Sequence, residues 1–472
     1  MRQGRSLLAA AFCAALLAVP AAEAAVEGPL RVLKANPRYF TDGSGKAVYL
    51  TGSHVWWNLA APDWTSGCWA APAAFDWERH LDWLGEHDHN FVRLWRVEHT
   101  RFTMCFDDRS GPQHPTTVAF HPWPRTGSEP ALDGLPKFDL GAFDQTYFDR
   151  LRERVAAANE RGIYVAVMLF EGWWLHSVDE ASRWDYHPFH AANNVNGIDG
   201  DSDGDGFGKE IVTLAPENAA ILAIQEAYVR KVVETVNDLP NVLYEIANEA
   251  GAWSAQWQYH MIRLVKSLQP AGQKRPVGMT YPHLGGNNKL VFQSPADWVS
   301  PWAHRYVTDP PVATGRKVVV SDPDHHCGIC GPEDPIQADA TFAWRSFMRG
   351  HNPIYMDVID EGGPDAVRRP IRMAMGQTLR WSKRIDLAAS RPRGHVSSTG
   401  YALTVGRRQY LVYQPRPRAF RVDLRKATGR FRVEWYRPAV GRSKLGKRVR
   451  GGAWRRFSPP FPGPSVLFLR RL

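Results

Sequence analysis

Short apolar runs alternate with stretches of helical period along most of the chain. Eight of these runs are typical of β-strands, at residues 48–52, 90–96, 163–170, 242–247, 276–280, 298–301, 317–321 and 354–357. Between them, apolar residues recur every three or four positions, for example at Ile221, Ile224, Tyr228 and Val232, as in amphipathic helices. The runs at 276–280 and 298–301 carry the weakest pattern. Because each helix can cover the outer face of a closed parallel sheet, this order predicts an α/β fold, a (β/α)8 TIM barrel.

The two ends of the chain follow other patterns. Residues 30–50 alternate around a turn-forming cluster at 41–45 and predict a β-hairpin. From about Ser397 onward, short alternating runs broken by Gly and Pro predict a small β-sandwich. At the N terminus, Arg2 and Arg5 precede an apolar run and a small-x-small sequence at 22–24, which is typical of a cleaved secretory signal. We therefore expect a signal peptide (1–24), a barrel with an N-terminal hairpin (25–390) and a C-terminal β-sandwich (391–472).

Composition adds an uneven distribution of charge. The chain has 472 residues, 44% hydrophobic and 22% charged, as in a folded soluble protein. After the signal, no run approaches the ~20 apolar residues of a membrane helix, so we expect a secreted or periplasmic protein without an integral membrane segment. Residues 391–472 hold 21 Lys and Arg against Asp423 and Glu434, a net charge of +19, whereas residues 25–390 carry −10.

The basic C-terminal region suggests a class of partner. Export makes nucleic acid an unexpected partner, so an anionic envelope polymer or surface is the expected one. The alternative is a solvated cationic surface with no dedicated partner.

Two carboxylates stand where predicted strands end. The strand at 242–247 continues into Asn248 and Glu249, and the strand at 317–321 continues into Asp322. The active site of a (β/α)8 barrel lies at these C-terminal strand ends, and two opposed carboxylates are the minimum equipment for glycoside hydrolysis. We predict Glu249 as the general acid/base and Asp322 as its partner. Alternatively, Glu249 is a solvated surface group and Asp322 caps a following turn.

The chain resembles retaining glycoside hydrolases of clan A, especially the family 5 cellulase-like barrels, from about residue 30 to 387. The matching segments are Asn-Phe-Val-Arg-Leu at 90–94, Tyr-Glu-Ile-Ala-Asn-Glu at 244–249, His-Arg-Tyr at 304–306 and Val-Val-Val-Ser-Asp at 318–322. The resemblance implies a carbohydrate substrate, with Glu249 as the acid/base. It also implies substrate-binding roles: Arg93 orients the nucleophile, Asn248 binds the sugar 2-hydroxyl, and His304 and Tyr306 lie beside the nucleophile.

The chain departs from that family at the nucleophile. The family has Glu on strand seven, whereas this chain has Asp322, one methylene shorter, and Asp324 is a competing candidate two residues later. Segments 36–42, 52–57 and 225–249 are similar to a narrower group of exported bacterial proteins that includes apiosidase-like barrels. The last 75 or so residues resemble a small β domain, named for collagen binding, that is often appended to such barrels. The name is not evidence of collagen binding.

Aromatic residues crowd the predicted barrel mouth. Trp56 and Trp57 follow the first strand, and Trp173 and Trp174 follow the third. Flat apolar rings at these places can stack on sugar faces, although core packing is the default for any one of 19 Trp. We take Trp56 and Trp173 as candidate sugar contacts, with Glu171 as a candidate contact to a sugar hydroxyl.

The loop at 199–210 matches the pattern D-x-D-x-D-G-x5-E at every specified position. Alternate carboxylates wrap one hard cation, and a glycine at 204 permits the turn. We expect a structural calcium ion here and no cofactor for catalysis, with the ligands Asp199, Asp201, Asp203, Asp205 and Glu210. The loop lacks the flanking helices of an EF-hand, so a flexible acidic loop is the alternative.

Four cysteines follow the signal, in a context that permits disulfides. We favour the pairs Cys68–Cys105 and Cys327–Cys330, because each pair falls in loops that the layout places close together. A four-thiolate zinc site is the alternative.

Metal-ligand residue types also gather after the seventh strand. An alternative function is therefore a metal-dependent hydrolase. Its metal ligands would come from Asp322, Asp324, His325 and His326, together with His54. We also count His54, Asp324 and His325 among the candidate substrate contacts. A non-catalytic carbohydrate-binding barrel is a third hypothesis, motivated by the Asp in place of Glu.

Overall fold

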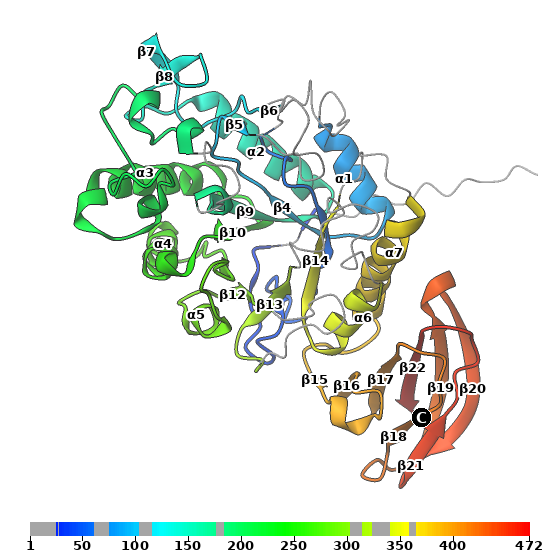
Figure 1. Cartoon of the computed structure of the whole chain (residues 1–472). Coiled ribbons are helices and arrows are strands. Elements are labelled where there is room, and N and C mark those ends of the chain that lie inside the picture. Colours follow the sequence, from blue (N-terminus) through cyan, green and yellow to red (C-terminus); the bar gives the residue numbers. More distant parts are fainter. Residues whose placement is uncertain are drawn as a thin grey trace, which may run out of the picture.

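A closed ring of parallel strands forms the main body of the molecule. The computed structural model describes residues 25–26, 28–60, 75–102, 116–175, 184–302, 314–322, 340–357 and 365–472. The strands of the ring are β3 (Gly52–His54), β4 (Phe91–Leu94), β9 (Tyr164–Glu171), β10 (Val242–Asn248), β11 (Val277–Thr280), β12 (Trp298–Ser300), β13 (Val318–Ser321) and β14 (Asn352–Met356). They are hydrogen-bonded in the order β3-β14-β13-β12-β11-β10-β9-β4 (Figure 1). The predicted (β/α)8 barrel is confirmed, including both strands with the weakest pattern.

Helices follow the strands and cover their outer faces. They are α1 (Trp77–Glu86), α2 (Gln145–Glu160), α3 (Ala219–Val236), α4 (Ala255–Leu268), α5 (Asn288–Gln293), α6 (Ala340–Met348) and α7 (Asp365–Ser382). Short strands β5 (Arg101–Phe102), β6 (Thr116–Thr117), β7 (Arg125–Pro130) and β8 (Pro136–Phe138) lie between β4 and α2. In the described segments, no helix is long and apolar enough to cross a bilayer.

The two ends of the sheet, β3 and β4, meet without a regular ladder. The backbone N–H of Asn90 donates to the carbonyl of Thr51, and the Oδ1 atom of Asn90 accepts from the N–H of Thr51, each at 3.0 Å. A Cβ atom at Gly52 would lie 2.0 Å from the carbonyl oxygen of Phe91. Only glycine permits this approach, so Gly52 and the Asn90 amide together close the barrel.

Strand alternation divides the barrel interior into an apolar and a charged layer. Apolar side chains from the strands pack with the N-terminal hairpin, β1 (Arg31–Val32) and β2 (Phe40–Thr41), and fill the bottom of the barrel. Two residues after Phe91 and Leu243 of this layer, Arg93 and Glu245 point into the same interior. The barrel is therefore sealed below and charged toward its mouth.

The C-terminal domain is antiparallel. Its strands are β15 (Ser390–Pro392), β16 (Ala402–Val405), β17 (Gln409–Gln414), β18 (Phe420–Asp423), β19 (Arg430–Arg437), β20 (Arg442–Arg450), β21 (Trp454–Phe457) and β22 (Ser465–Arg471). Six of them form a sheet in the order β15-β16-β17-β22-β19-β20, and the β18–β21 ribbon packs over one face through a shared apolar core. The predicted small β-sandwich is confirmed.

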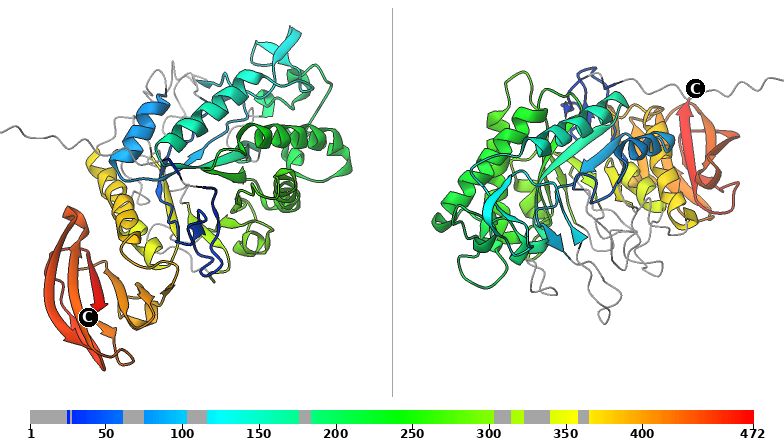
Figure 2. Two further views of the ribbon diagram at one scale, coloured as in Figure 1. Left: turned by 180° about the vertical axis from the view of Figure 1, so that it is seen from behind. Right: turned by 90° about the horizontal axis from the view of Figure 1, so that it is seen from above.

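The other face of this sheet packs on the barrel. The Trp344 ring of α6 stacks on Tyr413 with centroids 6.0 Å apart, and the Trp381 ring of α7 contacts Phe468 edge-on at 5.6 Å. These residues belong to one apolar cluster that spans both domains. Figure 2 shows the sandwich beside α6 and α7, on the opposite side of the barrel from α3. The two domains therefore form one packed unit.

The signal peptide expected at 1–24 and the four cysteines of the expected disulfides lie outside the described residues.

Burial of histidines makes the fold sensitive to acid. Burial lowers the pKa of His80, His89, His121 and His351 to about 3 from the ordinary 6.5. Between these values the unfolded chain binds protons that the folded chain does not, so stability is lost as the pH falls below 6.5. We predict that the free energy of unfolding decreases by about 1 kcal/mol per histidine from pH 7.5 to 5.5, as measured by urea denaturation.

Two variants test whether the buried histidines cause this loss of stability at low pH. His351→Gln should reduce the pH dependence, whereas a change at the exposed His395 should leave it intact. An unfolding free energy that is equal at the two pH values would contradict the prediction.

Candidate active site

A buried arginine joins three strands at the barrel mouth. Arg93 of β4 has a side chain only 1% exposed. Its Nε and Nη2 atoms donate to the two carboxylate oxygens of Glu245 at 2.9 and 2.5 Å, and its Nη1 atom pairs with Asp322. Nη2 also donates to Oδ1 of Asn248 at 3.2 Å. A planar guanidinium is suited to this shared, bidentate geometry, because its donors have fixed directions.

Asp322 follows β13 directly and is the second member of this group. Its side chain is 3% exposed, and its Oδ1 atom lies 3.9 Å from Nε2 of His54. His54 ends β3 and stacks on Trp95 with ring centroids 5.5 Å apart. The structure thus brings together three residues that the sequence marked separately: Arg93, Asp322 and His54.

Glu249 lies beside this group with an unusual backbone. Its φ of 44° is in the left-handed region, which among the described non-glycine residues only Asp88 shares. Such a conformation costs of order 1–3 kcal/mol and is found mainly at functional sites. The side chain of Glu249 is 15% exposed, and Oε1 lies 3.9 Å from Nδ1 of His283. Glu249 is therefore more open to a ligand than Asp322, Glu245 or Glu171.

Glu171 and Asn248 extend the network of the buried arginine to the strand end that precedes Glu249. Glu171 ends β9, and its carboxylate accepts hydrogen bonds from Nε1 of Trp95 at 2.8 Å and from the backbone of Trp173 at 2.9 Å. The Nδ2 group of Asn248 donates to Glu171 at 3.2 Å, while Oδ1 accepts from Arg93. An acceptor on one side and a donor on the other thus fix the orientation of the Asn248 amide.

A second buried ion pair supports Glu171 from below. The Oε1 atom of Glu98 accepts the backbone N–H of Glu171 at 2.7 Å, and Oε2 pairs with Arg96 at 3.1 Å. Burial opposes ionisation of Glu98, but the charge of Arg96 and a hydrogen bond from His187 keep its pKa below the ordinary value. The guanidinium of Arg96 lies 4.1 Å from the ring centroid of Tyr228, a cation–π contact.

The tryptophans of the mouth differ in burial, and the predicted sugar contact Trp173 is partly buried, with its ring centroid 4.9 Å from that of His283. Trp56, Trp57 and Trp174 are buried in an apolar cluster with Trp95. In contrast, Trp253 after β10 and Trp302 after β12 are 38% and 39% exposed. The exposed pair is better placed to reach a sugar, because more of each ring is open to solvent.

Some candidate residues lie outside the described part of the chain, and others were missed by sequence analysis. His304, Tyr306, Asp324 and His325 belong to the first group. Those missed are Glu245, Arg96, Glu98, His187 and His283. A signal existed for Glu245, because a charged residue within a strand otherwise buried on both faces must be paired, and Arg93 occupies the same kind of position.

The acidic loop brings four carboxylates together. Oxygens of Asp201, Asp203, Asp205 and Glu210 lie within 4.8 Å of one another, the one such group in the described segments. Asp199 is not among them, and its Oδ1 atom accepts the backbone N–H of Asp201. The Lys209 ammonium lies 2.9 Å from Asp203 and also pairs with Asp205, and these hydrogen bonds raise the pKa of Lys209. The loop therefore offers oxygen ligands suited to calcium, with a lysine competing for them.

Two sequence families match parts of the chain. One, described as "Domain of unknown function (DUF6298)", matches residues 113–277, and the other, "Putative collagen-binding domain of a collagenase", matches residues 396–465. No curated protein matches the chain. The C-terminal match agrees with the resemblance noted from the sequence.

Several solved structures similar to the chain are described as glycoside hydrolases. One described as a glycoside hydrolase has a TM-score of 0.61 at 13% identity, with 94% of this chain and 97% of its own covered. A family 5 glycoside hydrolase from Bacteroides vulgatus has a TM-score of 0.60 at 13% identity, with 94% of both chains covered. The protein shares its (β/α)8 barrel and C-terminal β domain with these structures. At such low identity the likeness concerns architecture, and residue roles within this fold depend on the geometry above.

Removing the central arginine tests the buried charge network of this glycoside hydrolase fold. We predict that Arg93→Met lowers the free energy of unfolding by about 3–5 kcal/mol, because it leaves the carboxylates of Glu245 and Asp322 buried without their cation. Arg152→Gln, which breaks the exposed pair with Asp238, should cost less than about 1 kcal/mol in the same urea titration. Equal losses would contradict a special role for Arg93.

We predict that calcium stabilises the protein through the acidic loop. At calcium concentrations about a hundred times the dissociation constant, stability should rise by about 2.7 kcal/mol and the melting temperature with it. Asp203→Asn should abolish the calcium-dependent rise in melting temperature, because a ligand is lost. Lys209→Gln should make the same rise occur at lower calcium concentration. The control Asp238→Asn, outside the loop, should leave the response to calcium unchanged. If added calcium does not change the melting temperature of chelator-treated protein, the prediction is wrong. The loop is then an acidic loop neutralised by Lys209.

Proposed function

We propose that the protein is a glycoside hydrolase that cleaves O-glycosidic bonds of an oligosaccharide or polysaccharide. One observation carries the proposal: Asp322 and Glu249 follow the ends of β13 and β10 at the same mouth, and Arg93 binds both Asp322 and Asn248, the residue before Glu249. The fold of solved glycoside hydrolases supports it. Paired carboxylates on such a rim are the equipment that hydrolysis of a glycoside requires.

The two carboxylates have different surroundings, which supports different roles. Glu249 is the more open group, so it acts as the acid that protonates the leaving sugar oxygen. Asp322 is held by Arg93, and in its charged form it attacks the anomeric carbon to give a glycosyl ester. Water, deprotonated by Glu249, then displaces Asp322 and restores the anomeric configuration, so the reaction is retaining.

Sugar binding would use the same mouth. Asn248 is oriented by Arg93 and Glu171 and is our candidate for the sugar 2-hydroxyl. Trp253 follows Glu249 in the chain, and Trp302 follows β12. Both rings are partly exposed. Their position on the rim supports stacking on sugar units.

The metal-dependent alternative is less well supported at Asp322. A guanidinium already pairs with this carboxylate, and a second cation on the same group would be repelled by Arg93. His54 lies near enough to Asp322 to contribute, so turnover in the presence of a strong chelator separates the two mechanisms. Loss of turnover that zinc restores would favour the metal enzyme.

Export is part of the proposal and rests on the signal-like sequence at 1–24. Sequencing the N terminus of protein recovered from culture medium or periplasm tests it, and we expect a start near Ala25.

Glu249 provides the sharpest test of the activity. We predict that Glu249→Gln lowers kcat about 10²–10⁴-fold on glycosides with poor leaving groups, because proton donation is lost. With a 2,4-dinitrophenyl leaving group, which needs little protonation, formation of the glycosyl ester should be far less affected. Asp322→Asn should lower kcat with both kinds of substrate. A panel of aryl glycosides and plant and envelope polysaccharides supplies the substrates.

Controls separate chemistry from folding. Glu217→Gln removes an exposed carboxylate and should keep full activity, and Glu217→Gln and Glu249→Gln should both retain the wild-type melting temperature within a few degrees. NMR of the first-formed product gives its anomeric configuration, and inversion would contradict Asp322 as nucleophile. Full turnover by Glu249→Gln on every substrate would refute the assignment, and saccharide binding without any turnover would favour a non-catalytic barrel.

A further inference from the structure

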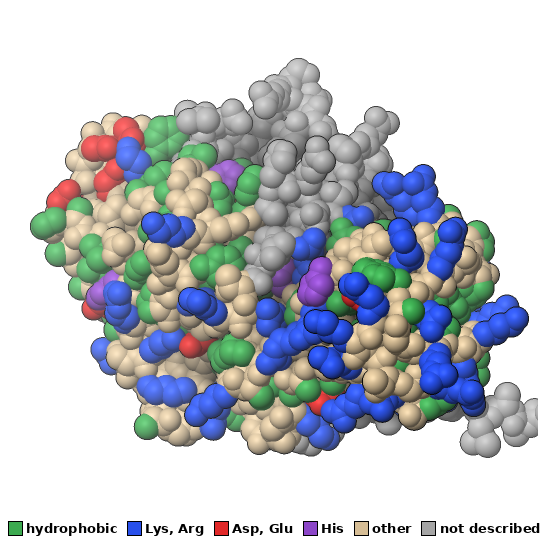
Figure 3. All heavy atoms as spheres, turned by 90° about the horizontal axis from the view of Figure 1, so that it is seen from below, with side chains coloured by type: hydrophobic (Ala, Val, Ile, Leu, Met, Phe, Trp, Pro, Cys, Tyr) green, Lys and Arg blue, Asp and Glu red, His purple; other side chains and the backbone are tan. Residues whose placement is uncertain are grey.

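Arginines oppose one another across the strands of the C-terminal domain. The residues directly opposite in the strand registers are Arg421 and Arg456, Arg430 and Arg450, Arg432 and Arg470, and Arg437 and Arg442. Like charges directly opposite each other destabilise a sheet. The surface seen from below carries many Lys and Arg side chains and few Asp or Glu (Figure 3). This arrangement costs stability unless an anion lies between the paired side chains.

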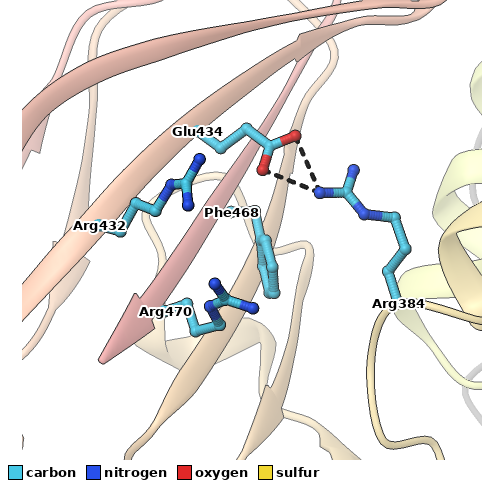
Figure 4. A pocket seen from close by; sticks show the side chains of 5 residues that line it. All are labelled: Arg384, Arg432, Glu434, Phe468 and Arg470. Atoms are coloured by element: carbon cyan, nitrogen blue, oxygen red, sulfur yellow. Dashed lines mark hydrogen bonds and ion pairs between the residues drawn. The ribbon is translucent and has the colours of Figure 1, made fainter. Parts of the chain in front are cut away.

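One of these pairs lines a cavity at the joint between the two domains. The cavity has a volume of about 100 Å³ and is lined by Arg384, Arg432, Glu434, Phe468 and Arg470 (Figure 4). Arg384 follows α7 of the barrel, and the other four belong to β19 and β22. On β19 the side chains at 432 and 434 share the sheet face that, at Tyr436, packs on the barrel. The cavity therefore lies at the boundary between the part of this sheet face that packs on the barrel and the part that is exposed to solvent.

The carboxylate in the cavity is already committed. Glu434 accepts hydrogen bonds from Nη2 of Arg384 at 2.9 and 3.0 Å and from the hydroxyl of Ser443 at 2.7 Å. Burial opposes ionisation of Glu434, but these hydrogen bonds and the charges of Arg384 and Arg432 keep its pKa below the ordinary value. Glu434 thus balances Arg384 and fixes it against the sheet.

Two positive charges remain. Within the described segments, no carboxylate forms an ion pair with Arg432 or Arg470, and both side chains are exposed at the cavity. The buried ring of Phe468 forms an apolar wall beside them, which strengthens charge interactions nearby. Two guanidiniums beside such a wall can both donate to one oxyanion, because the forked donors match carboxylate and sulfate geometry.

We propose that this cavity binds the carboxylate or sulfate groups of an acidic polysaccharide. The site goes beyond the proposed hydrolysis, since it lies on the sandwich and not at the mouth around Glu249. A polysaccharide chain fits better than a membrane surface, because the cavity is recessed between two packed domains whereas lipid headgroups lie in a plane. The apolar core shared by the domains holds the site at a fixed place relative to the barrel.

The test compares two double variants with the same change of charge. Arg432→Gln with Arg470→Gln removes the cavity pair, and Arg421→Gln with Arg456→Gln removes an opposing pair on the β18–β21 ribbon. Both are made in the full chain carrying Glu249→Gln, so that turnover does not consume the ligand. Binding to polygalacturonate and to dextran sulfate is measured by affinity electrophoresis and calorimetry at low and high salt, with neutral dextran as the control polymer.

We expect the cavity variant to bind the acidic polymers about tenfold more weakly or worse, as the loss of charge-assisted hydrogen bonds implies. The ribbon variant should stay within about twofold of the parent, and neutral dextran should not bind. The melting temperature of the cavity variant should be equal or higher, because a repulsive cross-strand pair has been removed.

Other outcomes overturn the proposal. Equal loss in both double variants would mean diffuse attraction by net charge, and no binding by the parent at low salt would mean a solubility feature. A third outcome is that acidic polymers do not bind, whereas vesicles of anionic phospholipid bind the parent and the ribbon variant but not the cavity variant. This outcome would assign the site to a lipid surface. None of these results depends on turnover, so they leave the proposed hydrolysis to its own test.

Discussion

The structure of the barrel mouth depends on the need to neutralise one buried cation. Arg93 is almost fully removed from water, and a charge in that position costs several kcal/mol unless it is paired and hydrogen-bonded. Glu245 satisfies two of its donors, and Asp322 takes a third. These partners are 152 and 229 residues away in the chain, so the arginine can be satisfied only when β4, β10 and β13 are correctly placed. The same contacts that make burial of Arg93 tolerable also fix the position of the proposed nucleophile.

The charged layer also explains why one carboxylate lies closer to solvent than the others. Glu245 and Asp322 are engaged by Arg93, and Glu171 is engaged by Trp95, Trp173 and Asn248. Glu249 is one residue beyond Asn248, where the strand ends and the backbone turns into the left-handed region. That turn redirects the side chain away from the alternating pattern of β10, toward His283 and solvent. The result is a carboxyl group that a substrate can reach.

The sequence predicts the barrel well because eight short apolar runs that alternate with helical segments have few other solutions at this length, and all eight strands occur within a few residues of their expected places. The terminal positions of Glu249 and Asp322 follow from the same pattern. The sequence pattern predicts side-chain contacts between strands less well. Glu245 was passed over because it lies inside a strand rather than at its end, and only the barrel geometry shows that it shares a layer with Arg93. Arg96, Glu98 and His283 could not be found at all, since their roles arise from the packing of loops that carry no periodic signal.

Charge and hydrophobic burial act at different places on the sandwich sheet. Its barrel-facing side begins with Tyr436 and Phe468, which pack against Trp381, and ends with Arg432 and Arg470, which do not. Apolar contact fixes the domain, so the arginines are not needed to hold it. Glu434 stands at the boundary between the two regions and pairs with Arg384 of the barrel, which prevents that one cation from adding to the repulsion between the others. A domain attached through aromatic packing therefore does not need its positive charge to hold it on the acidic barrel, and that charge remains directed outward.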